Sequence, residues 1–214
     1  ARQAWPGIRV VPQQGKGKGA ALRTGFAAAR GDIIVMLDAD GSTDPAEIPN
    51  FVARLLAGAD FAKGSRYLPG GGSSDISFFR ALGNAGLLAA VRMLFGFRYT
   101  DLCYGYNAFW RSVLPALDLN VDGFEIETCM NLRAGLAGLR VVEVPSFESE
   151  RVYGESRLRA LPDGWRVLKT IFREWASGAG RQPAVDQQAG AADLRPLTFA
   201  REDVRLPDLC AVEA

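Results

Sequence analysis

The sequence predicts an α/β fold with an open, mostly parallel sheet flanked by helices, and three features support this prediction. Residues 33–37 form a continuous apolar run, which is typical of a strand covered on both faces. Residues 8–11 are typical of a short strand closed by a proline, and a glycine-rich loop then leads into a helix. Strands and helices alternate in this way through residue 64. In such sheets, ligands bind at the carboxyl ends of the strands.

The next elements follow from cap residues and apolar spacing. Asp44 and Pro45 have the composition of a helix start, and apolar residues recur at helical spacing up to residue 56. A strand is expected over residues 60–64. Residues 68–75 contain three consecutive glycines and are too long for a tight turn, so they are predicted to form a mobile loop before a long helix.

The second half of the chain is less regular. Residues 100–110 are expected to carry one strand, residues 123–137 a helix, and residues 139–144 a strand that ends at a proline. Asp163, which follows a proline, is predicted to cap a last helix with an apolar stripe.

Chain length and composition predict one globular domain. The 214 residues are sufficient for one α/β domain, and the composition changes at residue 177 to Ala, Gly, Gln, Pro and Asp. We therefore expect a domain over residues 1–176 and a flexible tail over residues 177–214. No apolar stretch reaches about 18 residues and no signal peptide pattern is present, so we expect a soluble chain.

Charge and cysteine content narrow the class of function. The net charge is +1 with both signs interspersed, so the charge argues neither for a nucleic-acid partner nor for a strongly anionic membrane. The three cysteines are widely spaced and form no CxxC pair, which favours reduced thiols in a cytoplasmic compartment. The chain contains no histidine, which excludes Ser-His-Asp and Cys-His nucleophilic mechanisms and histidine metal sites. Any metal must therefore be bound by carboxylate oxygens.

Asp38 and Asp40 are the strongest candidate metal ligands. They follow the apolar run 33–37 directly, so both carboxylates are expected at the carboxyl end of a buried strand. Their mutual repulsion favours a hard divalent cation, Mg²⁺ or Mn²⁺, which would also bridge a diphosphate. Taken alone, the pattern is equally compatible with a solvated turn.

The wider set of motifs resembles the family 2 glycosyltransferases of GT-A fold, and within them the polyprenyl-phosphate sugar synthases. The resemblance covers about residues 8 to 175, and the ordered set is more specific than any single motif. Its members are Gly17-Lys18-Gly19, Asp38-Ala39-Asp40, Gly64-Ser65-Arg66-Tyr67, Arg80 with Asn84, residues 101–110, Phe124-Glu125-Ile126-Glu127, and Val144-Pro145 followed by Arg151 and Gly154-Glu155-Ser156. Relatives begin with a strand and a helix that bind the nucleotide base, so the resemblance implies a GT-A domain that lacks these first two elements.

The resemblance also implies ligands for the matching residues. Asp38 and Asp40 would hold the metal and the donor diphosphate, while Ser42 stands where relatives often carry a further ligand. The other implied donor-binding residues are Lys18, Arg151 and Ser156. Arg66 and Arg80 match arginines that contact an acceptor phosphate, a role that suits guanidinium groups. Taken singly, most arginines are ordinary solvated residues, and Lys18 could simply solubilise the glycine loop.

The implied reaction is inverting transfer of a sugar from a UDP- or GDP-linked donor to an acceptor, with the metal stabilising the departing diphosphate. A polyprenyl phosphate at the inner face of the membrane is the expected acceptor; it is already anionic and needs no base. A hydroxyl acceptor would need a carboxylate base, and Asp101, Glu125 and Glu127 are the candidates. On a helix Glu125 and Glu127 do not share a face, so at most one is expected to point into the site.

Two alternatives from other classes stay open at this point. Residues 38–42 also resemble the opening motif of haloacid dehalogenase type phosphatases, but the later acidic pair that such enzymes need is missing from the sequence. The second alternative is a degenerate, non-catalytic scaffold with the transferase fold, which metal-dependent donor transfer or hydrolysis would distinguish from an enzyme.

Overall fold

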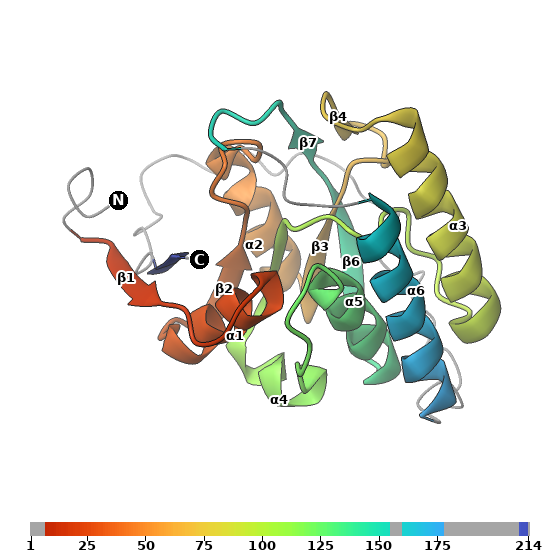
Figure 1. Ribbon diagram of the computed structural model, residues 1–214. Helices are drawn as coiled ribbons and strands as arrows, with labels where there is room; N and C mark the ends of the chain where they lie inside the picture. Colours follow the sequence, from red (N-terminus) through yellow and green to blue (C-terminus); the bar gives the residue numbers. More distant parts are fainter. Residues whose placement is uncertain (1–6, 155–159, 178–209, 214) are drawn as a thin grey trace.

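The structure is a computed structural model that describes residues 7–154, 160–177 and 210–213 (Figure 1). Its centre is a four-stranded open sheet in the order β2-β5-β3-β6. The strands are β2 (Ile33–Met36), β5 (Asn107–Trp110), β3 (Phe61–Ser65) and β6 (Val141–Pro145). Strand β5 runs antiparallel to both of its neighbours, whereas β3 and β6 are parallel. The predicted open α/β sheet is therefore present, with mixed strand directions because β5 enters the middle of the sheet from the second half of the chain.

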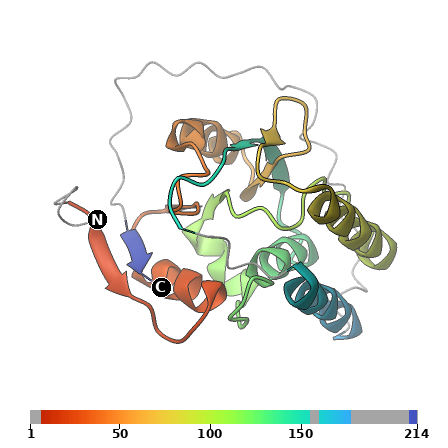
Figure 2. The same ribbon diagram turned by 45° about the horizontal axis from the view of Figure 1, so that its top comes forward.

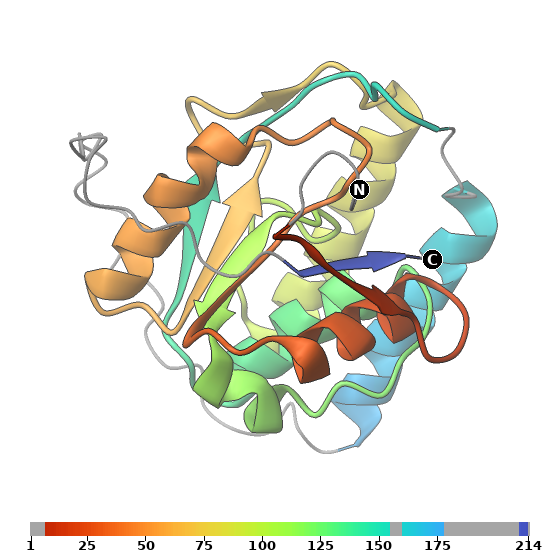
Figure 3. The same cartoon turned by 90° about the vertical axis from the view of Figure 1, so that its left-hand side faces the viewer.

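Helices cover both faces of this sheet (Figure 3). Helix α2 packs on one face, and the other helices lie toward the opposite side (Figure 1). Their bounds are α1 (Lys18–Ala28), α2 (Ile48–Leu56), α3 (Phe78–Phe95), α4 (Leu114–Leu117), α5 (Ile126–Leu136) and α6 (Ala160–Ala176).

The alternation of side chains along the strands divides the core into two clusters. In β2, Ile34 and Met36 join the larger cluster with α1, α3, α5 and α6, whereas Ile33 and Val35 face the smaller one under α2. In β3, Phe61 belongs to the larger cluster and Ala62 to the smaller. A strand buried in this way on both faces reads as a continuous apolar run, which explains the pattern of residues 33–37.

Two further strand pairs lie outside the central sheet. Strand β4 (Gly72–Ser73) lies within the predicted glycine-rich loop and pairs in parallel with β7 (Phe147–Glu148). Strand β1 (Arg9–Pro12) pairs in parallel with β8 (Cys210–Glu213), beside α1 (Figure 2). Four residues of the predicted tail thus form a strand; residues 178–209 and 214 lie outside the described residues.

Side-chain caps mark the starts of two helical segments, and the predicted start of the last helix is corrected. Asp44 caps a 3₁₀ turn at Pro45–Glu47 that leads into α2, and Ser77 caps α3 by accepting a hydrogen bond from the Arg80 amide. The prediction that Asp163 caps the last helix is wrong, because α6 begins at Ala160. A proline at residue 162 fits inside the first turn of a helix, where no intrahelical partner for its nitrogen is needed.

The sequence predicts no segment long and apolar enough to cross a membrane, but helix α3 is one by length and composition. In the described part of the chain, it is the one helix that passes this test by length and composition. Its inner side nevertheless packs on the domain through Asn84, Val91 and Phe95, which are buried. The helix is therefore packed against the domain along one side.

Candidate functional site

The two candidate metal ligands lie in the turn that follows β2. Oδ1 of Asp40 accepts a hydrogen bond from the Ser42 amide at 3.0 Å, and the Thr43 hydroxyl donates to the Asp38 carbonyl at 3.2 Å. Ser42 and Thr43 are buried, so the turn is held against the domain while both carboxylates stay partly accessible. The sequence prediction of two acidic groups at a strand's carboxyl end matches this placement.

Lys18 joins this turn to helix α5. Its Nζ atom lies 2.8 Å from Oδ1 of Asp38 and 2.6 Å from Oε1 of Glu127. Burial lowers the pKa of Lys18, but the charges of Glu127 and Asp38 outweigh this and raise it, so the ammonium stays charged. Burial is also the main cause that raises the pKa of Glu127, and the charge of Lys18 partly offsets it. Glu127 thus points into the site, while Glu125 accepts from the Gly123 amide outside it.

The glycines on either side of Lys18 explain how α1 reaches this position. Gly17 has φ +96°, a conformation that favours glycine, and the Gly19 amide donates to the Asp122 carbonyl at 2.8 Å. A Cβ atom on Gly17 would overlap the Asp122 carbonyl oxygen, and one on Gly19 the Val121 carbonyl oxygen. The start of α1 therefore lies directly against the backbone that precedes α5, which brings Lys18 to Glu127.

Gly19→Ala is expected to destabilise the protein by about 1–3 kcal/mol, because the added methyl group overlaps rigid backbone. The free energy of unfolding from urea titration measures this effect. Gly86→Ala is the matched control, since a Cβ atom there meets nothing within 4 Å. Equal stability of Gly19→Ala and the control would contradict the close approach of α1 to residues 121–122.

Gly105 is required by the site for a different reason. A Cβ atom on Gly105 would lie 2.9 Å from Oδ2 of Asp38 and 3.0 Å from Nζ of Lys18. Both are ends of flexible side chains, so they can move aside without a change in the backbone. Gly105→Ala is expected to weaken ligand binding at Asp38 about tenfold or more by displacing this carboxylate, with the melting temperature nearly unchanged. Calorimetric titration with Mn²⁺ and differential scanning calorimetry measure the two quantities; a large loss of stability with unchanged binding would contradict the expectation.

A second cluster of charged side chains is centred on Arg66. Its Nε and Nη2 atoms donate to the two oxygens of Asp101 at 2.7 and 3.0 Å, and Nη1 donates to Glu148 at 2.9 Å. Its guanidinium lies 4.8 Å from the centre of the Tyr104 ring. Burial raises the pKa of Asp101, but the hydrogen bonds and charge of Arg66 outweigh this and hold that pKa below its usual value. Both Arg66 and Asp101 are thus neutralised by protein partners, and their predicted contacts with substrates stay predictions.

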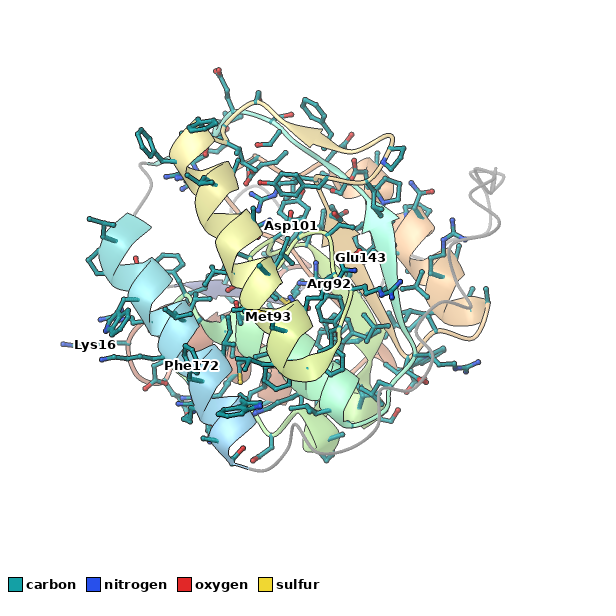
Figure 4. The ribbon with its side chains drawn as sticks, turned by 90° about the vertical axis from the view of Figure 1, so that its right-hand side faces the viewer. Lys16, Arg92, Met93, Asp101, Glu143 and Phe172 are labelled. Carbon is teal, nitrogen blue, oxygen red and sulfur yellow. The ribbon has the colours of Figure 1, made fainter. Side chains whose placement is uncertain are left out.

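Glu143 supports the segment that carries Asp101. Its carboxylate accepts hydrogen bonds from the Thr100 amide at 3.0 Å and from the Thr100 hydroxyl at 2.8 Å. The buried Lys63 ammonium lies 3.4 Å from the same carboxylate. Figure 4 labels Asp101 and Glu143 within the domain. This network fixes the backbone on which the Arg66–Asp101 pair depends.

A third cluster of charged side chains contains Asp75, which the sequence motifs do not identify as a site residue. The Nε atom of Arg151 lies 3.5 Å from Asp40 and 3.4 Å from Asp75, and Arg80 pairs with Asp75 at 3.5 Å. Alternating charges therefore extend from the turn after β2 to the first turn of α3. Asp75 ends the glycine-rich loop and carries no motif of its own, so only its contact with Arg151 reveals it.

The segment that carries Arg151 crosses the turn after β2. The amides of Val152 and Tyr153 donate to the Asp40 carbonyl at 2.9 and 3.0 Å, and the Ser149 amide donates to the Ser42 carbonyl at 2.8 Å. The predicted donor-binding residue Ser156 lies outside the described residues. Of the predicted residues, the structure thus brings Lys18, Asp38 and Glu127 into direct contact, and it joins Arg151 to Asp40 and, through Asp75, to Arg80.

The chemistry of the turn fits a divalent cation. Asp38 and Asp40 provide hard oxygen ligands, and the described residues contain no group of three acidic, cysteine or histidine side chains around them. Mg²⁺ is commonly bound by one or two carboxylates together with substrate phosphates and water, so two carboxylates are sufficient when a diphosphate provides further oxygens. Lys18 and Arg151 supply positive charge on either side for such an anion.

The chain matches a known protein family over more than half of its length. The family model described as glycosyl transferase family 2 matches residues 1–116, which include the turn after β2. The chain belongs to this family. Membership in family 2 rules out the haloacid dehalogenase type interpretation of residues 38–42.

Two curated relatives have names that refer to a polyprenyl phosphate or to its mannosyl derivative. The polyprenol monophosphomannose synthase of Mycolicibacterium smegmatis is 36% identical over 177 residues, covering 78% of this chain and 65% of the relative. The undecaprenyl-phosphate mannosyltransferase of Micrococcus luteus is 33% identical over 160 residues, covering 72% of this chain and 65% of the relative. The chain thus spans just under two thirds of the length of each.

A solved structure similar to this chain supports the expected GT-A type fold. Glucosyl-3-phosphoglycerate synthase from Mycobacterium tuberculosis, in complex with Mn²⁺, UDP-glucose and glycerol 3-phosphate, is 26% identical with a TM-score of 0.57. The match covers 82% of this chain and 59% of that one. The GT-A type α/β fold expected for this family 2 domain is confirmed.

Proposed function

We propose that this family 2 domain transfers a sugar from a UDP- or GDP-linked donor to a polyprenyl phosphate at the inner face of the membrane, in an inverting reaction that depends on Mg²⁺ or Mn²⁺. The observation that carries the proposal is the turn after β2, where two carboxylates lie between Lys18 and Arg151. Alternating charges of this kind suit a metal-bound diphosphate. The names of the relatives support the class of acceptor.

The donor diphosphate is proposed to lie against Asp38, Asp40, Lys18 and Arg151. A bound divalent cation would supply electrostatic stabilisation of the charge that develops on the leaving diphosphate. Lys18 holds Asp38 in place and keeps its own positive charge beside the leaving oxygens. Arg151 reaches the turn from the segment that crosses it, so this segment is suited to close over the donor. Ser156, which lies outside the described residues, stays a proposed donor contact.

The acceptor phosphate is proposed to meet Arg80 in the first turn of α3. Arg80 pairs with Asp75 at 3.5 Å, and a guanidinium forms strong, two-pronged hydrogen bonds with phosphate oxygens. Arg66 has both edges occupied by Asp101 and Glu148, so its main role is proposed to be positioning of the loop next to the acceptor. Because a phosphate is already ionised, this reaction needs no general base. For a hydroxyl acceptor, Glu127 is the better candidate base, since burial raises its pKa and Asp101 is held ionised by Arg66.

Calorimetric titration of the 214-residue chain with UDP-glucose and with GDP-mannose, each with and without Mn²⁺, tests the proposal. We expect metal-dependent binding of one donor, which identifies the nucleotide, and transfer of its sugar to a short-chain polyprenyl phosphate. Binding without transfer or hydrolysis would favour the non-catalytic scaffold. Absence of binding for both donors would overturn the proposed function.

A further inference from the structure

Asp75 lies between two arginines to which the proposed function gives different substrates. Its Oδ2 atom is 3.4 Å from Nε of Arg151, the proposed donor contact, and 3.5 Å from Nη1 of Arg80, the proposed acceptor contact. One carboxylate oxygen therefore faces both guanidinium groups. The proposed function gives Asp75 no role of its own.

The contacts of Asp75 are long compared with those of the other charged cluster in the site. Arg66 donates to Asp101 at 2.7 and 3.0 Å, close to the usual length of a charge-assisted hydrogen bond. Nε of Arg151 is buried and lies 3.5 Å from Asp40 and 3.4 Å from Asp75, yet it has no hydrogen-bond partner among the described residues. A buried N–H group without an acceptor is costly, so a better-placed anion would stabilise Arg151.

Hydrogen bonds of the backbone fix the position of Asp75. Its amide donates to the Ser73 hydroxyl at 3.1 Å, and that hydroxyl donates to the Glu148 carboxylate at 2.7 Å. The Ser74 amide also donates to the Glu148 carbonyl at 2.9 Å, next to the pairing of β4 with β7 (Figure 1). The loop before α3 is thus tied to the segment that carries Arg151 three residues later. The fold itself holds Asp75 beside Arg151.

A ligand can reach all three charged side chains. The exposed fractions are 33% for Asp75, 30% for Arg80 and 26% for Arg151. Phosphate oxygens bind a guanidinium through two parallel hydrogen bonds, as a carboxylate does. A phosphate group that binds either arginine must therefore displace Asp75 or bear the repulsion of its charge.

We propose that Asp75 is an internal competitor for the phosphate groups of the substrates, a role that rests on the proposed function. When no anion is bound, its carboxylate partly neutralises Arg151 and Arg80. The donor diphosphate displaces Asp75 from Arg151, and Asp75 returns when the nucleoside diphosphate leaves after sugar transfer. Asp75 thus weakens binding of this product and favours its release. It acts through the two arginines, so it is a positioning residue.

Calorimetric titration of the 214-residue chain with pyrophosphate in the presence of Mg²⁺ tests the proposal. Asp75→Asn retains the shape of the side chain and removes its charge, so it is expected to bind pyrophosphate about three- to tenfold more tightly than the parent chain. Asp75→Ser, a second neutral variant, is expected to show the same gain, and Asp75→Glu to bind as weakly as the parent chain. A merely structural role would give the opposite result, because a loosened loop would weaken binding.

Asp60→Asn is the matched control, because it changes the net charge by the same amount. The Asp60 side chain is also 33% exposed and lies 3.7 Å from Arg140. It precedes β3, which runs in the same direction as β2, so it lies at the end of the sheet opposite the turn after β2. This variant is expected to bind pyrophosphate as the parent chain does. In an Arg151→Met background, Asp75→Asn is expected to change the affinity less than about twofold, because the competition acts at Arg151.

Three results would overturn the proposal: neutral variants of Asp75 that bind pyrophosphate no more tightly than the parent chain, an equal gain in Asp60→Asn, or a full gain that persists in the Arg151→Met background. Thermal unfolding of each variant checks that it folds. Donor titration keeps the two proposals separate. Unchanged pyrophosphate affinity of Asp75→Asn, in a chain that binds UDP-glucose or GDP-mannose, refutes the competition alone. Tighter pyrophosphate binding, in a chain that binds neither donor, refutes the proposed function alone.

Discussion

Asp38→Asn is expected to lower the rate of sugar transfer about 10²- to 10³-fold, which corresponds to several kcal/mol of lost transition-state stabilisation. The amide has the same shape but no negative charge, so it weakens binding of a divalent cation and leaves the Lys18 ammonium with Glu127 as its remaining carboxylate partner. The steady-state rate and the Mn²⁺ affinity from calorimetry measure the two consequences. We expect both to fall while the fold is kept, because the Asp38 side chain is 38% exposed.

Asp32→Asn is the matched control for this variant. Asp32 precedes the same strand at its opposite end, its side chain is 89% exposed, and its nearest ion-pair partner, Arg111, is 3.7 Å away. This control should keep the parent rate and the parent metal affinity. If Asp38→Asn retained normal Mn²⁺ affinity, or if the control lost as much activity, the assignment of the metal site to the turn after β2 would be refuted.

Arg66→Met is expected to destabilise the protein by about 3–5 kcal/mol, because it leaves the carboxylate of Asp101 buried without its partner. Asp101 is fully buried, and Arg66 makes a two-pronged contact with it while also reaching Glu148. The methionine side chain retains the apolar volume of the arginine stem, so the loss reports on charge more than on packing. Chemical denaturation, followed by circular dichroism, measures the free energy of unfolding.

The double variant Arg66→Met/Asp101→Asn separates the two contributions. Neutralising Asp101 removes the uncompensated buried charge, so the double variant should be more stable than Arg66→Met alone. The surface variant Arg111→Met, which removes only a long ion pair, should change stability little. A double variant whose losses simply add would show that Arg66 and Asp101 do not act as a pair.

Local pattern predicted the secondary structure well where one physical cause dominates. The apolar run 33–37 became β2 because the strand is buried on both faces, and Asp44 caps the 3₁₀ turn that leads into α2, as its side-chain chemistry favours. The start of α6 was misplaced because Pro162 is compatible with a position inside the first turn as well as before it. The antiparallel direction of β5 could not be predicted from the sequence, because nothing in residues 107–110 specifies which strands they pair with.

The sequence by itself determined the family and the chemical character of the candidate site: carboxylates at a strand end, a lysine between glycines, and arginines in a fixed order. Only the tertiary structure decided which charges meet. Lys18 contacts Glu127 because Gly17 and Gly19 let α1 approach the backbone before α5, and Asp75 became part of the site through Arg151. Likewise, the apolar residues of α3 and α6 could equally have been core until packing buried one side of each helix and exposed the other. Local sequence sets the conformation and the chemistry of each segment, whereas contacts between distant segments depend on how the whole chain packs.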